Sequence, residues 1–387
     1  MKIRKLCEPL FMAAALSIPA AALASGPDTD WRQMGFSAKG DRFNKHETVL
    51  NAGNVAGLSV AWSAETGDVI RSSPASANGI VYAGSWDGKL YALDEATGAV
   101  KWVADAPGIR NSSPAIADGR VFVASYYGVL YAFQIADGKP AWTAKLGRYE
   151  GASPTVANDT VYVTSAGKLY AFDAKSGALK WRVRTGGTQS PAVANGVVYV
   201  GGKGTLRGLD AATGAVIWRR EAPVISAPAY SNGALYAVYL MPTNEYGVYA
   251  AEAATGKELW HSPFGGFSQS GVAVANGLVY AGSFDGNLYT FDAKTGASKW
   301  NFNAGTEIDD TPAVANGVVY VASTEDGVLY ALDAASGSSL WSAPATNTFM
   351  FSPPSVVNGR VFVGSDNHKL YSFALDGGNR AGGINSR

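Results

Sequence analysis

The sequence contains almost no cysteine, little charge and no apolar run of membrane-spanning length, and each shortage excludes a class of protein. The single cysteine, Cys7, lies near the N-terminus, so the rest of the chain can form neither a disulfide nor a thiolate metal site. Lysine and arginine number 31, as do aspartate and glutamate, and no basic run of the kind that follows phosphates occurs. Nucleic acid is therefore not an expected partner.

Common catalytic motifs are also missing. The three histidines are scattered, and neither a His-Glu-x-x-His pair nor a Gly-x-Ser-x-Gly elbow occurs. Gly201-Gly-Lys-Gly204 lacks the spacing of a phosphate loop and lies in a strand-rich unit, which favours a hairpin. No catalytic residue is assigned from the sequence.

The first 24 residues have the pattern of an export signal. A basic start precedes an apolar stretch from Leu10 to Leu23, and small residues suit cleavage after about Ala24. The stretch is about 14 residues long and contains Pro19, whereas a spanning helix needs roughly 20 residues. We expect a signal peptide over 1–24 and a periplasmic or secreted mature chain without a membrane span.

A tryptophan that returns about every forty residues is the strongest pattern in what the chain does contain. The successive gaps are 40, 40, 39, 37, 42, 40 and 41 residues. The eight residues are Trp62, Trp102, Trp142, Trp181, Trp218, Trp260, Trp300 and Trp341. A period near forty, with strand-like segments inside each unit, is typical of a β-propeller.

Each unit has the pattern of four short strands joined by tight turns. Between Ser72 and Trp102, apolar runs of four to six residues rich in Val and Tyr alternate with turn residues such as Asn78-Gly79 and Asp87-Gly88. Runs of this length and composition favour strands over amphipathic helices. A proline near the first strand, Pro74 in this unit, recurs in most units.

The two ends of the repeat region complete each other. Seven units contain all four expected strands, and the eighth lacks the last strand, which carries the tryptophan. Leu58–Trp62 has the pattern of that last strand, but the first three strands of a unit do not precede it. We therefore predict an all-β, eight-bladed β-propeller of four-stranded antiparallel blades over 58–375, closed by the N-terminal strand and monomeric. Residues 25–57 would be a lead-in segment and 376–387 a C-terminal tail. Closure removes unpaired sheet edges.

The eight tryptophans are expected to have a structural docking role. An indole on a half-exposed outer strand can cover the seam between neighbouring blades, and an aromatic side chain buries ~150–250 Å². Ligand stacking is the weaker interpretation, because every repeat carries one.

The block Asp-Ala-x-Thr-Gly-x-x-x-Trp, present at Asp210–Trp218 and Asp292–Trp300, resembles the tryptophan-docking motif of the pyrroloquinoline-quinone (PQQ) repeat superfamily. The resemblance covers about Leu58 to Phe373 and implies a quinoprotein-like propeller. Before the repeats, Asp30-Trp31 and Gly40–Asn44 resemble the amino-terminal lead-in of quinoprotein alcohol dehydrogenases.

The resemblance implies two different functions. The dehydrogenases bind PQQ in the propeller axis beside calcium and oxidise alcohols. Another branch resembles the scaffold lipoprotein of outer-membrane barrel assembly, which has no cofactor. The length and short loops of this chain fit the second branch, whereas the lipid-attachment cysteine of that lipoprotein is missing. No calcium-ligand motif, adjacent-cysteine disulfide or haem-binding Cys-x-x-Cys-His of the first branch is present, so no residue is carried over from it.

We expect a periplasmic binding or scaffold protein without catalysis and without a cofactor. Its partner would be a protein of the cell envelope or a small-molecule ligand. The alternative is a PQQ-dependent alcohol dehydrogenase with a minimal axial pocket that holds PQQ and calcium. A polysaccharide-binding or other secreted enzyme role is a third possibility.

Candidate ligand-binding residues lie two to four positions before the repeat proline, where the innermost strand is expected to begin and to rim the axial channel. The residue types at these positions vary between units. Because packing of the repeats does not require such variation, it can reflect binding of a ligand. The set comprises Arg71, Arg110, Asn111, Glu150, Gln189, Gln269, Asp309 and Asp310, with Ser226 and Phe351 at equivalent positions.

Two kinds of chemistry are open to this set. Arg71 and Arg110 could bind a carboxylate or phosphate. Asp309 and Asp310, with Glu150, could hold calcium, or one carboxylate could act as a base. Solvated polar side chains without any ligand are the plainer interpretation.

Overall fold

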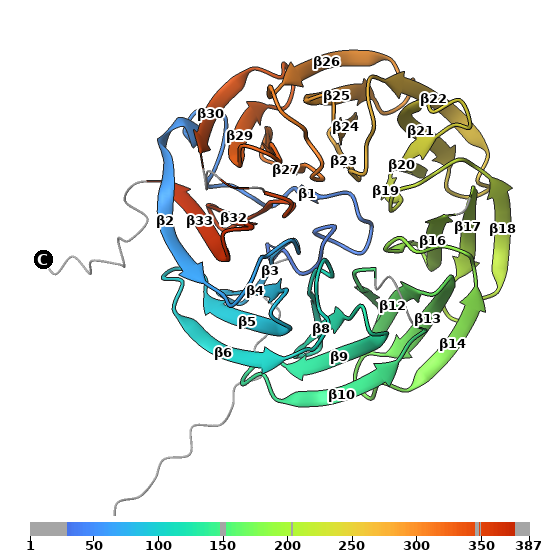
Figure 1. Ribbon diagram of the computed structural model, residues 1–387. Coiled ribbons are helices and arrows are strands. Elements are labelled where there is room, and N and C mark those ends of the chain that lie inside the picture. The colour runs from blue at the N-terminus through green and yellow to red at the C-terminus, as the bar shows by residue number, and fades with distance from the viewer. Residues whose placement is uncertain (1–28, 148–151, 203, 345–347, 349, 376–387) are drawn as a thin grey trace, which may run out of the picture.

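The computed structural model describes residues 29–147, 152–202, 204–344, 348 and 350–375. The described residues form eight antiparallel sheets arranged in a ring around a central axis (Figure 1). The expected signal peptide and C-terminal tail lie outside the described residues. No helix in the described part is long and apolar enough to span a membrane.

Strands in equivalent positions have similar lengths from blade to blade. The innermost strands are β3 (Ala75–Ala77), β7 (Ala115–Ala117), β11 (Thr155–Ala157), β15 (Ala192–Ala194), β19 (Ala229–Ser231), β23 (Val272–Ala275), β27 (Ala313–Ala315) and β31 (Ser355–Val357). The second strands are β4 (Ile80–Ser85), β8 (Arg120–Ala124), β12 (Thr160–Ser165), β16 (Val197–Gly202), β20 (Ala234–Leu240), β24 (Leu278–Gly282), β28 (Val318–Ala322) and β32 (Arg360–Gly364).

The third and outer strands complete the eight blades, which are numbered from the first to the eighth in chain order. The third strands are β5 (Lys89–Asp94), β9 (Val129–Gln134), β13 (Lys168–Asp173), β17 (Thr205–Asp210), β21 (Tyr246–Glu252), β25 (Asn287–Asp292), β29 (Val328–Asp333) and β33 (Lys369–Leu375). The outer strands are β6 (Val100–Asp105), β10 (Pro140–Lys145), β14 (Leu179–Arg184), β18 (Val216–Glu221), β22 (Glu258–Phe264), β26 (Ser298–Asn303), β30 (Ser339–Pro344) and, in the eighth blade, β2 (Leu58–Glu65).

The ring closes as predicted. The eighth sheet has the order β31-β32-β33-β2, and β2 pairs with β33 in an antiparallel register that runs from Leu58 opposite Leu375 to Glu65 opposite Lys369. The N-terminal and C-terminal strands thus share one sheet, so unfolding of either end opens the whole ring. The eight-bladed, all-β architecture is confirmed.

The recurring Asp-x-x-Thr-Gly block forms the turn between the third and outer strands. In the first blade, Asp94 Oδ1 accepts hydrogen bonds from the backbone N–H of Thr97 at 3.0 Å and from its hydroxyl at 2.9 Å. The hydrogen bond from Lys101, followed by those from Thr97, lowers the pKa of Asp94. The motif is therefore explained by turn chemistry.

The repeating tryptophans lie in the seams between blades. Among the described residues, six indoles donate from Nε1 to a backbone carbonyl of the next blade at 3.0 to 3.1 Å, from Trp62, Trp102, Trp142, Trp181, Trp218 and Trp260. Trp62 also covers Gly98 of the first blade, where a Cβ would lie 2.6 Å from the ring. In seven seams of the described residues, an indole from one blade thus covers a turn glycine of the next blade.

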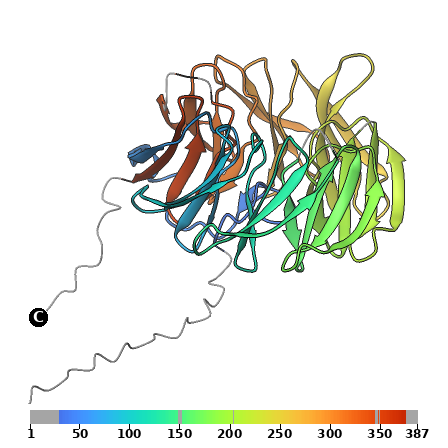
Figure 2. The same cartoon turned by 60° about the horizontal axis from the view of Figure 1, so that its bottom comes forward.

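A lead-in segment before the repeats closes one end of the axial channel, as the blue segment inside the ring shows (Figure 2). Backbone carbonyls of this segment accept hydrogen bonds of 2.7 to 3.0 Å from the innermost strands of six blades, at Ser76, Ile116, Val193, Tyr230, Val274 and Val314. In the two remaining blades, the side-chain amide of Gln33 bonds both backbone groups of Val156, and Asn44 Nδ2 donates to Val356 O at 2.8 Å. Residues 31–44, which we call the plug, therefore contact all eight blades.

Arg42 anchors the plug from within. Its guanidinium is fully buried and donates to the carbonyl of Pro312 at 2.7 Å and to those of Met34 and Pro354. It also lies over the ring of Trp31 at 5.2 Å. Burial lowers its pKa to about 9, so the side chain is charged at neutral pH. β1 (Phe43–Asn44) then pairs in parallel with β27, and η1 (Val55–Gly57) leads into β2.

Candidate functional site

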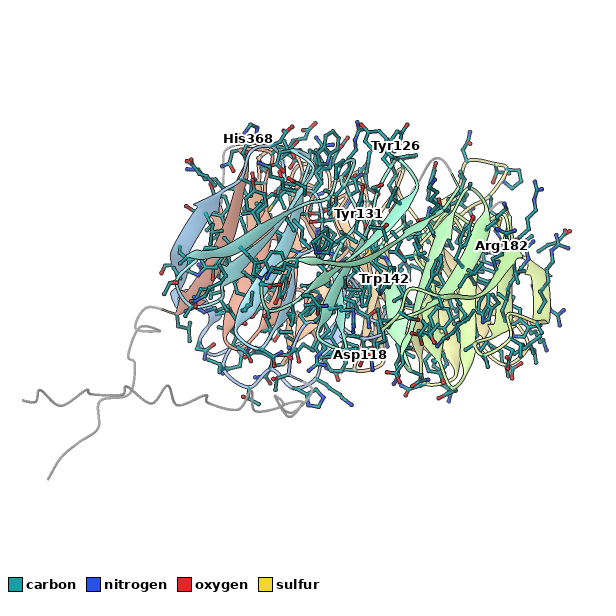
Figure 3. The ribbon with its side chains drawn as sticks, turned by 90° about the horizontal axis from the view of Figure 1, so that it is seen from below. Asp118, Tyr126, Tyr131, Trp142, Arg182 and His368 are labelled. Carbon is teal, nitrogen blue, oxygen red and sulfur yellow. The ribbon has the colours of Figure 1, made fainter. Side chains whose placement is uncertain are left out.

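The other end of the channel is open, and we call it the mouth. Figure 3 labels Tyr126 and His368 at this edge of the ring and Asp118, near the plugged end, at the opposite edge. One detail of the sequence prediction was wrong: most innermost strands begin just after the repeat proline and not before it. The rim residues therefore lie in loops, where the alternation of strand side chains does not apply.

Several hydroxyls beside the repeat prolines are structural. The backbone N–H groups of Ser73 and Ser113 donate to the hydroxyls of Ser113 and Ser153, respectively, each at 2.9 Å, and so connect three consecutive blades. Ser226, one of the candidates, is buried and accepts a hydrogen bond from Val238 N at 2.8 Å. The hydroxyl of Ser226 therefore stabilises the loop that precedes the innermost strand of the fifth blade.

Five planar side chains form a continuous stack across the eighth, first and second blades. The guanidinium of Arg71 lies 4.2 Å from the ring centre of Phe351 and 4.9 Å from that of Trp86. The guanidinium of Arg110 lies 5.1 Å from Trp86 and 4.8 Å from Tyr126. Cations and aromatic rings thus alternate, and each contact is of the cation–π type. We call this set the mouth stack.

The two arginines of the mouth stack differ in charge balance. Arg71 forms a two-pronged ion pair with Asp366, with distances of 3.0 and 2.6 Å. Arg110 is exposed and has no ion pair with any residue that the structure describes. Asn111 Oδ1 accepts a hydrogen bond from Trp86 Nε1 at 3.2 Å, which helps to orient the indole. Arg110 is therefore held by two rings while its N–H groups remain available to an anion.

A cavity of about 410 Å³ lies beside Arg110. Its walls include Trp86, Arg110, Asn111 and Gln189, and Met34 of the plug also lines it. The plug thus contributes one wall of this cavity, which is partly open to solvent. A volume of this size suits a few side chains or a small ligand.

Asp309 and Asp310 lie near the stack but do not line this cavity. Burial and the negative charge of Glu307 raise the pKa of Asp309 to about 6, against the opposing charge of Arg71. Asp310 is almost fully buried, and burial, with the charge of Asp309, raises its pKa well above the usual range. Oδ1 of Asp309 and Oδ2 of Asp310 are both buried without a hydrogen-bond partner among the described atoms.

The calcium hypothesis finds too few ligands in the described part of the chain. No group of three or more His, Cys, Asp or Glu side chains placed to hold a metal ion occurs there. Glu150, the third carboxylate of that hypothesis, lies outside the described residues. The two aspartates alone do not offer the six to eight oxygens that calcium prefers.

The structure brings some of the candidate residues together and leaves others apart. Arg71, Arg110, Asn111 and Phe351 meet at the mouth stack, and Gln189 lines the same cavity. Gln269 is exposed and is not among the cavity residues.

Sequence reasoning missed Trp86, Tyr126 and Asp366. These three occupy equivalent positions in the turn between the second and third strands of their blades, immediately after a serine. Variation between units at that position could have identified them, because the same criterion selected the residues before the prolines.

The chain shares its repeat region with a known protein family. The model of the family described as outer membrane protein assembly factor BamB matches residues 46–185, 128–243 and 244–382. These matches together span most of the sequence. No curated protein sequence matches the chain significantly.

Solved structures of more than one kind share the fold. BamB from Moraxella catarrhalis is 22% identical over 83% of this chain and 98% of that chain, with a TM-score of 0.69. A europium-containing methanol dehydrogenase is 16% identical over 90% of this chain and 98% of that one, with a TM-score of 0.78. A quinohemoprotein alcohol dehydrogenase from Comamonas testosteroni is 17% identical over 92% of this chain and 82% of that one, with a TM-score of 0.73. At these identities the likeness concerns the fold, which hosts more than one function.

Proposed function

We propose that this chain, which belongs to the family of outer membrane protein assembly factor BamB, is a binding or scaffold protein of the cell envelope that acts without catalysis. It binds a partner at the open mouth of its propeller. Export by the leader at 1–24 is part of the proposal. Mass spectrometry of the mature protein would then place its first residue near Ser25.

One observation carries the proposal, namely the exposed guanidinium of Arg110 beside a cavity that Met34 of the plug also lines. Trp86 and Tyr126 hold the guanidinium at 5.1 and 4.8 Å. A guanidinium fixed in this way loses little conformational entropy when it binds a carboxylate. The mouth therefore suits a partner that inserts an acidic side chain or a terminal carboxylate.

Site-specific photocrosslinking in the native envelope tests this binding site. A photoreactive phenylalanine analogue at Tyr126 places the probe at the mouth, and the same analogue at Asp118 places it at the plugged face (Figure 3). We expect a discrete protein adduct from the mouth position and its loss when Arg110→Ala is added. Equal adducts from both positions, or no effect of Arg110→Ala, would overturn the proposal.

A PQQ-dependent alcohol dehydrogenase remains the second candidate, because the mouth cavity combines an indole with a free guanidinium. PQQ is a planar tricarboxylate, so Trp86 and Arg110 have the chemistry to hold it. Bound PQQ would accept the electrons released in alcohol oxidation. The calcium that accompanies PQQ lacks a sufficient set of carboxylates among the described residues.

A retention experiment separates the two candidates. The purified protein is incubated with PQQ and calcium chloride, desalted and scanned for quinone absorbance. Under the scaffold proposal we expect no retained quinone and no alcohol-dependent dye reduction. Retained quinone with dye reduction would establish the dehydrogenase instead.

A further inference from the structure

Five arginines lie on neighbouring strands at the outer side of the third and fourth blades. Arg182 and Arg184 belong to β14, Arg219 and Arg220 to β18, and Arg207 to β17. All except the half-buried Arg207 are exposed. Figure 1 shows β14 and β18 as adjacent outer strands, and Figure 3 labels Arg182 on the side of the ring. We call this surface the basic wall.

The positive charges of the basic wall are not balanced within the described part of the chain. None of the five arginines forms an ion pair there, and Glu221 is the only carboxylate on β14 and β18. Arg207 and Arg219 lie directly opposite each other in the strand register. Burial and the charge of Arg219 both lower the pKa of Arg207. Like charges in this arrangement oppose folding, so an external anion would relieve the repulsion.

The fold itself does not require these arginines. The residues that follow the repeat tryptophan on the eight outer strands are Ser63, Val103, Thr143, Arg182, Arg219, His261, Asn301 and Ser342. Arginine occupies this position in two adjacent blades only. Protection of an exposed sheet edge from aggregation also does not explain it, because β30 carries no charged residue.

The same strands offer a backbone edge for binding. β14 and β18 each stand last in the order of their sheets, so their outer edges pair with no other strand among the described residues. The wall also exposes apolar side chains: Leu179 is 47% exposed, Val216 51% and Ile217 53%. An added strand can use such an edge for main-chain hydrogen bonds and the exposed side chains for specificity.

We propose that the basic wall binds an extended acidic segment of a partner protein. Alternate residues of a strand lie about 6.6 to 6.8 Å apart, so carboxylates at alternate positions of an added strand match the spacing of Arg182 and Arg184. Apolar residues of the segment cover Leu179 or Ile217. This surface is separate from the mouth. The unpaired strand edge and the exposed apolar side chains favour a polypeptide over a lipid surface as the occupant.

Binding of two labelled peptides tests the proposal on the whole mature protein. One peptide carries glutamate at alternate positions with valine between them, and its twin carries glutamine in place of each glutamate. We expect the glutamate peptide to bind in fluorescence anisotropy and the glutamine peptide to bind at least about tenfold more weakly. The double variant Arg182→Gln/Arg184→Gln should weaken the glutamate peptide by about tenfold.

Matched variants separate this site from general charge effects. Lys89→Gln/Lys294→Gln removes two exposed positive charges from the first and sixth blades and should leave the affinity unchanged. Arg182→Glu/Arg184→Glu should bind a peptide with lysine at alternate positions better than the glutamate peptide. Melting temperatures confirm that each variant is folded.

Three outcomes would overturn the proposal. The first is equal binding of the glutamate and glutamine peptides, and the second is equal weakening by the lysine control. The third is flotation with phosphatidylglycerol vesicles that depends on Arg182 and Arg184 without peptide binding, which would identify a lipid surface instead. None of these measurements involves the mouth, so they do not decide the proposed function.

Discussion

The two ends of the axial channel use arginine in opposite ways. At the plugged end, Arg42 is buried and donates to the carbonyls of Met34, Pro312 and Pro354. At the mouth, Arg110 is exposed, lies over two aromatic rings and forms no ion pair with a described residue. A guanidinium whose three nitrogens each donate to a protein carbonyl stabilises the fold, whereas one held by its faces keeps its donors for another molecule.

The same contrast extends to the segments around the arginines. The plug forms hydrogen bonds with the innermost strand of every blade, so its conformation is determined many times over. The mouth consists of loops, in which buried hydroxyls such as Ser72 and Ser352 bond to their own blades and the hydroxyl of Ser352 also donates to the carbonyl of Ser72 in the next blade. Substitutions at the two ends should therefore divide cleanly into effects on stability and effects on binding.

Loss of Arg42 should have the largest effect on stability. Arg42→Ala leaves buried carbonyls of the plug and of the seventh and eighth blades without donors, and each unsatisfied group costs about 1–3 kcal/mol. We expect the free energy of unfolding to fall by about 5 kcal/mol in urea denaturation. Arg110→Ala is the matched control and should change it by less than about 0.5 kcal/mol. Similar losses from both variants would remove the distinction between the two ends.

Removal of a seam indole should have the next largest effect. Trp218 is almost fully buried and donates from Nε1 to Ala253 O at 3.0 Å. Trp218→Ala leaves a cavity and should reduce the free energy of unfolding by about 3 to 5 kcal/mol. A neutral result in thermal denaturation would contradict the docking role of the repeating tryptophans.

A smaller substitution compares two seams that differ in one hydrogen bond. Nε1 of Trp300 is buried without a partner among the described atoms, whereas that of Trp218 is satisfied. Phenylalanine removes the N–H from either seam. We expect Trp218→Phe to cost about 1 kcal/mol more than Trp300→Phe, measured by chemical denaturation of both variants. Equal costs would show that the indole N–H contributes nothing to the seam.

The blades could be predicted from the sequence because their signals are local and repeated. The tryptophan period, the Asp-x-x-Thr-Gly turns and the incomplete eighth unit together predicted the ring and its closure by β2, which the structure confirms. The plug could not be predicted, because its hydrogen bonds to the eight blades come from different residues and follow no period. One hydrogen-bond partner of Arg42, the carbonyl of Pro354, is 312 residues away along the chain, and nothing in the sequence near Arg42 indicates this contact.

The mouth was predicted in part for the same reason. The position before the repeat proline selected Arg71 and Arg110 as candidates, and the structure places both guanidiniums in one stack, while ligand binding by either residue stays a prediction. The partner of Arg71, Asp366, is 295 residues away along the chain, and ring closure alone brings the two together. Asp309 and Asp310 were candidates for a calcium site, and the structure buries one oxygen of each without a partner among the described atoms.

The buried carboxyl of Asp309 should make stability depend on pH. Its pKa is raised from 3.8 to about 6, so the folded state holds the proton more tightly than the unfolded state does. The stabilisation is full below pH 3.8 and is lost as the pH rises through about 6. Asp309→Asn should therefore be more stable than the parent by about 1 to 2 kcal/mol at pH 7.5, and the difference should vanish near pH 4.

An aspartate with the opposite shift provides the control. Hydrogen bonds from Thr295 and Lys299 lower the pKa of Asp292 to about 2, so its contribution is present at neutral pH and is lost as the pH falls through about 2. Asp292→Asn should thus lower the melting temperature at pH 7.5, where Asp309→Asn raises it. The same sign for both variants would contradict the assigned environments.

The mouth stack should show the smallest effect on stability and a large effect on binding. Trp86→Ala removes the ring that lies between the guanidiniums of Arg71 and Arg110, and the indole is half-buried in loops outside the blade core. We expect a change of less than about 1 kcal/mol in the free energy of unfolding, because exposed cation–π contacts contribute about 0.5–1 kcal/mol.

Without the ring of Trp86, Arg110 must be ordered at the moment of binding, so the mouth crosslink at Tyr126 should weaken as it does in Arg110→Ala. Trp86→Phe keeps a ring in place and should restore most of the crosslink. A crosslink that survives Trp86→Ala would mean that the partner recognises the shape of the mouth and that the charge held there plays no part.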